Sequence, residues 1–66
     1  MKIRLNGEER EVQAGIHIPD LIAALGLEGR RVAVELNRDI VRKDGWSEIE
    51  IREADEIEIV QFVGGG

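Results

Sequence analysis

Apolar and charged residues alternate at the start of the chain, in residues 1–5. This period of two is typical of a half-buried β-strand. Asn6 and Gly7 follow, and because both residue types accept positive φ, the pair predicts a tight hairpin turn. We expect the return strand over residues 8–13, with Val12 as its clearest inward-facing residue. Its other positions are mostly charged, which favours a place at the edge of a sheet.

The pattern then changes to the period of a helix. Four apolar residues are spaced i, i+3, i+4 and i+7 and would form one helical face: Ile18, Leu21, Ile22 and Leu25. Pro19 marks the start of this helix, because proline is tolerated only in the first turn. Asp20 suits the positive end of the helix dipole, and Gly26 is a natural residue to end the helix. The sequence therefore predicts one short helix.

Strand-like alternation returns in the second half of the chain. Residues 32–37 form the clearest strand, and a turn and a short strand at 40–41 follow it. Residues 43–45 are expected to form a loop. Isoleucines alternate with charged residues in 49–52 and again in 56–59, and the second of these segments is the last predicted strand.

This order of elements predicts an α+β fold, a roll of the β-grasp kind. One main helix would cover one face of a mixed sheet of four or five strands. The first and last strands are expected to lie side by side and parallel at the centre, since the intervening chain is long enough for the crossover that parallel strands need. We interpret residues 1–63 as a single domain and residues 64–66 as a flexible glycine tail.

The last predicted strand contains a change of phase. Ile57 and Ile59 would point toward the helix, but the next residue in that phase is Gln61, and the apolar positions move to Val60 and Phe62. A regular strand cannot bury both sets unless both faces of the sheet are covered. Either a bulge or a covering loop buries Val60 and Phe62, or the two residues form an exposed patch suited to docking.

The composition narrows the classes of function. The chain has 66 residues with 14 acidic and 9 basic side chains, a formal net charge of −5 and no cysteine. A small domain without disulfides is expected in the cytoplasm, and no stretch is long enough to span a membrane. The acidic balance argues against nucleic acid as a partner, as does the shortage of aromatic residues, which are Trp46 and Phe62 alone. The excess of acidic side chains suits a partner protein with a basic surface. The alternative is that these side chains only keep a small domain soluble.

The side chains offer little chemistry of their own. Ser47 is the only serine and His17 the only histidine, and they form no recognisable pair of nucleophile and base. His17 precedes the predicted helix, where capping or exposure is the expected role. Acid pairs such as Glu48 and Glu50 alternate with inward isoleucines, so a solvated strand face is expected rather than a metal site. We therefore expect no catalytic residue, no metal and no bound cofactor.

The glycine tail is the remaining candidate for chemistry. Gly64, Gly65 and Gly66 can reach about 10 Å at about 3.3–3.6 Å per residue, and without Cβ atoms they fit a narrow channel. A carboxylate at Gly66 would become an acyl donor after attack on the α-phosphate of ATP. No nucleotide-binding loop occurs in this sequence, so a partner enzyme would have to supply the ATP site. The opposing interpretation is that such a tail is an inert terminus.

The chain resembles the ThiS family of ubiquitin-like sulfur carriers, which serve thiazole formation in thiamine biosynthesis. The resemblance covers the full length and is carried by residues 1–7 (MKIRLNG), 32–37 (VAVELN) and above all 55–66 (DEIEIVQFVGGG). The fold of the family is the β-grasp, in agreement with the prediction above. One departure is the segment 16–19 (IHIP), where the family often has Ser or Thr ahead of the helix. That difference affects helix capping and not the tail.

The resemblance implies a carrier without an active site of its own. An adenylyltransferase of the ThiF type would use Mg-ATP to adenylate Gly66, a cysteine desulfurase relay would supply sulfur, and a thiazole synthase of the ThiG type would consume the thiocarboxylate. Gly64 and Gly65 would give the tail its reach, and Val60, Phe62 and Val63 would contact the partners. Two alternatives stay open at this stage. One is the small subunit of molybdopterin synthase, and the other is a non-reactive β-grasp interaction module.

Overall fold

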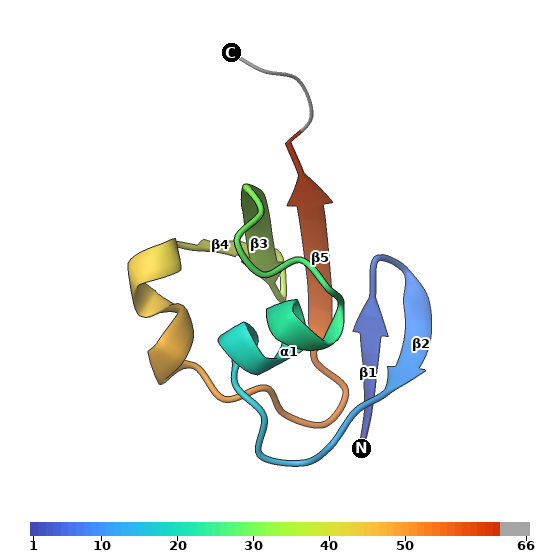
Figure 1. The fold of residues 1–66 in the computed structure, drawn as a ribbon. Helices are drawn as coiled ribbons and strands as arrows, with labels where there is room; N and C mark the ends of the chain where they lie inside the picture. The colour runs from blue at the N-terminus through green and yellow to red at the C-terminus, as the bar shows by residue number, and fades with distance from the viewer. Residues whose placement is uncertain (63–66) are drawn as a thin grey trace.

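A computed structural model describes residues 1–62 of the chain (Figure 1). Its elements follow in the order β1 (Lys2–Leu5), β2 (Glu8–Glu11), α1 (Ile18–Ala24), β3 (Val32–Leu36), β4 (Asp39–Val41), the 3₁₀ helix η1 (Lys43–Glu48) and β5 (Glu56–Gln61). The strands form one five-stranded sheet in the order β2-β1-β5-β3-β4. The predicted β-grasp roll with one main helix is confirmed.

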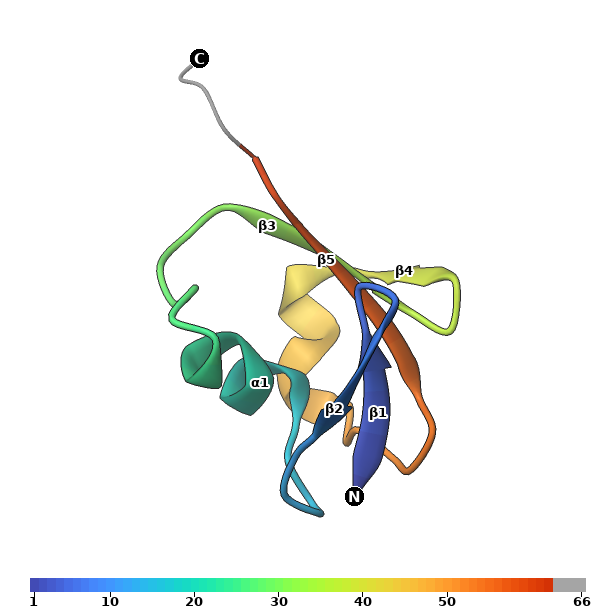
Figure 2. The same cartoon turned by 90° about the vertical axis from the view of Figure 1, so that its right-hand side faces the viewer.

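The first and last strands are neighbours, as predicted. β1 pairs with β5 in parallel, and β5 also pairs antiparallel with β3, so β5 is the central strand of the sheet. Figure 2 shows α1 and η1 on the same side of β5. The sheet therefore has one covered face and one face without a helix.

The first hairpin turns at Asn6 and Gly7, whose φ values of 51° and 82° match the expected tight turn. β2 ends at Glu11, earlier than the predicted 8–13, and all four of its residues are exposed. Val12 lies beyond the strand and is half-buried against the core. Its N–H donates to the carbonyl of Met1 at 2.8 Å, so after the end of β2 the chain is still bonded to the residue that precedes β1.

The helix α1 begins and ends where its sequence signals lie. Pro19 occupies the first turn, and the backbone N–H of His17 donates to Asp20 Oδ2 at 2.8 Å. Gly26 has a φ of 73°, the left-handed conformation that glycine adopts readily after a helix. Ile18, Leu21 and Ile22 are buried, while Leu25 is only half-buried and packs at the margin of the core.

The segment after β4 differs from the prediction. Residues 43–45 were expected to form a loop, and they begin the 3₁₀ helix η1 instead. Trp46 in this helix is only 8% exposed, and its Nε1–H donates to the carbonyl of Val41 at 3.0 Å. Residues 49–52 form no strand of the sheet; a single bridge joins Glu50 to His17.

The core lies between the covered face of the sheet and the two helices. It contains ten buried apolar residues: Ile3, Leu5, Ile18, Leu21, Ile22, Val34, Trp46, Ile51, Ile57 and Ile59. Buried and more exposed residues alternate along β1 and through Ile59 of β5. The period of two in the sequence therefore marks the buried face of these strands.

Candidate partner-binding surface

Two exposed apolar side chains lie at the carboxyl-terminal end of β5, Val60 within the strand and Phe62 directly after it. Val60 is 57% exposed and Phe62 is 60% exposed, whereas Ile57 and Ile59 are 1% and 8% exposed. The pairing with β3 continues without a bulge through Gln61. The phase change therefore moves the apolar side chains from the covered face to the open face, and neither a bulge nor a covering loop buries them.

Two asparagines hold β5 from both sides. The side-chain oxygen of Asn6 accepts a hydrogen bond from the N–H of Ile59 at 2.8 Å, and that of Asn37 accepts one from the N–H of Glu56 at 2.9 Å. Both asparagines have positive φ, at 51° and 50°, which Asn tolerates better than most residues. The turns that end β1 and β3 thus each add a side-chain hydrogen bond to the neighbouring central strand.

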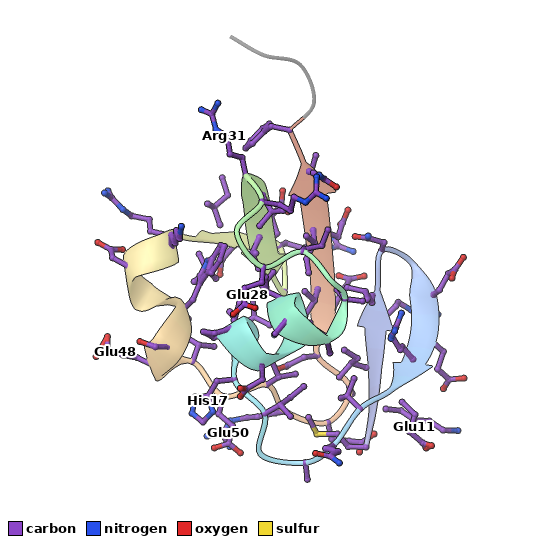
Figure 3. The ribbon with its side chains drawn as sticks, in the orientation of Figure 1. Glu11, His17, Glu28, Arg31, Glu48 and Glu50 are labelled. Carbon is purple, nitrogen blue, oxygen red and sulfur yellow. The ribbon has the colours of Figure 1, made fainter. Side chains whose placement is uncertain are left out.

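Phe62, the residue after β5, is hydrogen-bonded to the loop before β3. The N–H of Phe62 donates to the carbonyl of Arg31 at 2.9 Å. Figure 3 shows Arg31 beside the point where β5 ends. Since the backbone is held as far as Phe62, its exposed ring is presented from a fixed position rather than from a loose end.

The open face around this end combines apolar and acidic side chains. Opposed residues of an antiparallel pair point to the same face, so Ala33 lies beside Val60, and Glu35 lies between Glu58 and Ile40. Ile40 is 76% exposed. This face suits a protein partner that offers apolar contacts together with basic side chains.

The other residues considered for chemistry lie away from this end. Figure 3 shows His17 and Glu50 together near one end of α1, with Glu48 on η1, at the opposite end of the molecule from the end of β5. Ser47 is exposed on η1. In residues 1–62 no group of three or more His, Cys, Asp or Glu side chains is placed to hold a metal ion. No helix in that same range has the length and apolar character needed to cross a membrane.

Four of the predicted site residues, Val63, Gly64, Gly65 and Gly66, lie outside the described residues. The predicted roles of Val60 and Phe62 in binding stay predictions, although both side chains are accessible. Sequence reasoning missed the two asparagines that hold β5. In the sequence, Asn6 and Asn37 are recognisable as turn residues. Nothing in the sequence around them indicates that their side chains bond to another strand.

Comparison with known proteins identifies the family. The model of the ThiS family matches residues 3–66. The chain belongs to the ThiS family. The sulfur carrier protein ThiS of Bacillus subtilis is 42% identical over 65 residues, which are 97% of this chain and 98% of that protein. The ThiS crystal structure from Geobacter metallireducens superposes with a TM-score of 0.86 at 26% identity, with both chains fully covered. The predicted resemblance and the β-grasp fold are thereby confirmed.

A second kind of relative is much longer. A thiazole synthase of Paramagnetospirillum magneticum is 42% identical over 66 residues, and one of Magnetococcus marinus is 41% identical over the same length. The match takes in all of this chain but only 20% of each of those proteins. The chain thus spans about a fifth of the length of these curated relatives.

Proposed function

We propose that this chain is a sulfur carrier for thiazole formation in thiamine biosynthesis, with the sulfur carried on the carboxylate of Gly66. The observation that carries the proposal is the match to the Bacillus carrier over 98% of that protein's length. The exposed apolar end of β5 supports it, because Val60 and Phe62 stand next to the residues that lead to Gly66. The chain also lacks cysteine, so no thiol of its own can carry sulfur.

The proposed chemistry proceeds in three steps that begin at the carboxylate of Gly66. A carboxylate oxygen attacks the α-phosphate of Mg-ATP held by a ThiF-type adenylyltransferase, and pyrophosphate leaves. A persulfide sulfur, formed by a cysteine desulfurase, then attacks the acyl carbon and expels AMP. A thiol reduces the resulting acyl disulfide and leaves a thiocarboxylate. The domain itself supplies recognition and reach, while its partners supply the reactive groups.

A thiazole synthase is the proposed consumer of that sulfur. In two relatives that bear this name, a segment like this chain forms a fifth of a longer protein. Joining of two activities in one chain is expected where the carrier must dock repeatedly on the synthase, since a covalent link raises their effective concentration. In the present chain the same docking would use Val60, Phe62 and Val63.

Mass spectrometry of the intact protein tests the carrier proposal. The chain is incubated with a ThiF-type enzyme, Mg-ATP, a cysteine desulfurase, cysteine and a thiol reductant. We expect a mass gain equal to the difference between sulfur and oxygen, located in the carboxyl-terminal peptide. A matched control carries one alanine after Gly66, which leaves residues 1–62 untouched and should gain no mass. A thiocarboxylate on the untrimmed extended chain, or none on the original one, would refute the proposal.

A further inference from the structure

Within residues 1–62, one edge of the carboxyl-terminal part of β5 has no neighbouring strand. β1 pairs with β5 only at Glu56 and Ile57, whereas β3 pairs with it from Ile57 through Gln61. Figure 1 shows β5 continuing past the hairpin of β1 and β2, with β3 on one side and no strand on the other. The last residues of the central strand therefore have the character of an edge strand on one side.

The backbone pairing shows which groups face that side. The carbonyl of Ile57 accepts from Asn6 N–H at 2.9 Å on the β1 side, while Phe62 N–H donates to Arg31 on the β3 side. Because successive residues of a strand alternate in direction, the N–H and carbonyl of Gln61 face the β1 side. Within residues 1–62 no group pairs with Gln61 N–H or with the carbonyls of Ile59 and Gln61 on that side.

A hollow of about 500 Å³ lies beside this free edge. Its lining is mixed: four residues are apolar (Leu5, Leu25, Leu27 and Ile59), Asn6 and Gln61 are polar, and β2 contributes the charged Glu8, Glu9 and Arg10. Leu25 and Leu27 are only half-buried and pack against the core from the end of α1. A strand added along β5 would thus find backbone partners, and its side chains would meet the half-buried Leu25 and Leu27 on one side and the charged residues of β2 on the other.

We propose that a thiazole synthase adds an extended strand of its own to this edge of β5. This inference rests on the proposed function and adds to it a second contact, separate from the open-face side chains of Val60 and Phe62. Free N–H and carbonyl groups at strand spacing are matched best by another extended backbone. The relatives that contain this domain within a thiazole synthase supply the identity of the partner.

Amide exchange measured by NMR gives the direct test. The ¹⁵N-labelled chain is compared alone and in complex with a thiazole synthase. We expect exchange of the Gln61 amide to slow by about tenfold or more in the complex, the effect of one added hydrogen bond. The Phe62 amide, which is already bonded to Arg31, is the internal control and should be protected in both states. A Gln61 amide that exchanges equally fast in both states would overturn the inference.

A pair of variants tests the same contact by affinity. Gln61→Pro removes an N–H that has no partner within residues 1–62, and proline is tolerated at a strand edge. Gln61→Ala keeps the N–H and changes only the side chain. We expect Gln61→Pro to bind the synthase about tenfold more weakly than Gln61→Ala, with the two variants giving the same Phe62 protection. Equal affinities would contradict the strand contact.

The outcomes also separate this inference from the carrier proposal. If the chain gains sulfur but forms no complex with the synthase, the strand contact is wrong and the carrier function stands. If the complex forms with Gln61 protected but no thiocarboxylate is made, the contact stands and the carrier chemistry is wrong.

Edge strands also pair with copies of themselves. Protection of Gln61 that rises with the concentration of the chain alone would assign the edge to self-association and overturn the proposal.

Discussion

Substitution at Phe62 should separate binding from folding. Phe62 is 60% exposed, so folding removes only about two-fifths of it from water. Full burial of a large apolar side chain contributes about 1.5–3 kcal/mol, so two-fifths of that, about 0.6–1.2 kcal/mol, is the share lost in Phe62→Asp. Ile59, three positions earlier, is 8% exposed. Ile59→Ala removes core packing and should cost about 2–5 kcal/mol.

Urea unfolding followed by tryptophan fluorescence measures both variants. Trp46 is the only tryptophan and is buried, so its emission reports on the core. A domain of this size has a total stability of about 3–10 kcal/mol, against which the two losses are easily told apart. In parallel, titration with a thiazole synthase should show weaker binding by Phe62→Asp. If Phe62→Asp instead lowers the free energy of unfolding as much as Ile59→Ala, Phe62 belongs to the core and the reasoning fails.

Three further substitutions test contacts elsewhere in the fold. Asn6→Gly keeps the positive φ but leaves the N–H of Ile59 without its acceptor; it should lower stability by about 1–3 kcal/mol in urea unfolding, and an unchanged midpoint would contradict this role. Trp46→Phe removes the donor to the carbonyl of Val41 and should lower the thermal midpoint measured by circular dichroism. Ile40→Lys changes a side chain that is 76% exposed, so its stability should stay within about 0.5 kcal/mol of the original.

The parts of the fold that follow from local patterns could be predicted. The first hairpin needs two residues that accept positive φ, and Asn6 and Gly7 supply them. The helix needs a start and an end, and Pro19 and Gly26 mark both. Each of these signals acts within a few residues, so it is readable before the rest of the chain is placed.

The segment between β4 and β5 shows why local patterns fail elsewhere. Ile51 is fully buried, yet its N–H donates to the carbonyl of Ile16 at 2.8 Å, and the carbonyl of Ile49 accepts from Ile18 at 3.2 Å. This extended stretch therefore pairs with the chain that enters α1 and not with the sheet. Alternation of apolar and polar residues indicates an extended backbone with one buried side. It does not indicate which segment of the chain that backbone pairs with.

The 3₁₀ helix was missed for a related reason. Lys43, Asp44 and Gly45 favour a loop by composition. Trp46 is the one large apolar residue of that segment, and burying it beside α1 bends the backbone into a compact turn. Its indole hydrogen bond to Val41 is a tertiary contact that no window of sequence contains.

The candidate site was predictable in part. The move of apolar residues to Val60 and Phe62 is visible in the sequence, but their exposure depends on whether any other segment covers the open face. The hydrogen bonds from β5 to Asn6 and Asn37 could not be predicted, because the side chain of an asparagine in a turn usually bonds to the backbone of its own turn. Here each one reaches across to the strand beside it.

Along β5 the parts played by side chain and backbone change within a few residues. At Ile57 and Ile59 the side chains fill the core, so substitution there acts on folding. At Phe62 the side chain faces outward while its N–H is held by Arg31, so substitution there should act on partners. At Gln61 the groups that lack a partner among the described residues belong to the backbone, and alanine leaves them in place. A scan of side chains would therefore report Gln61 as neutral even if its backbone is a main contact of the complex, and only a backbone change such as proline can reveal it.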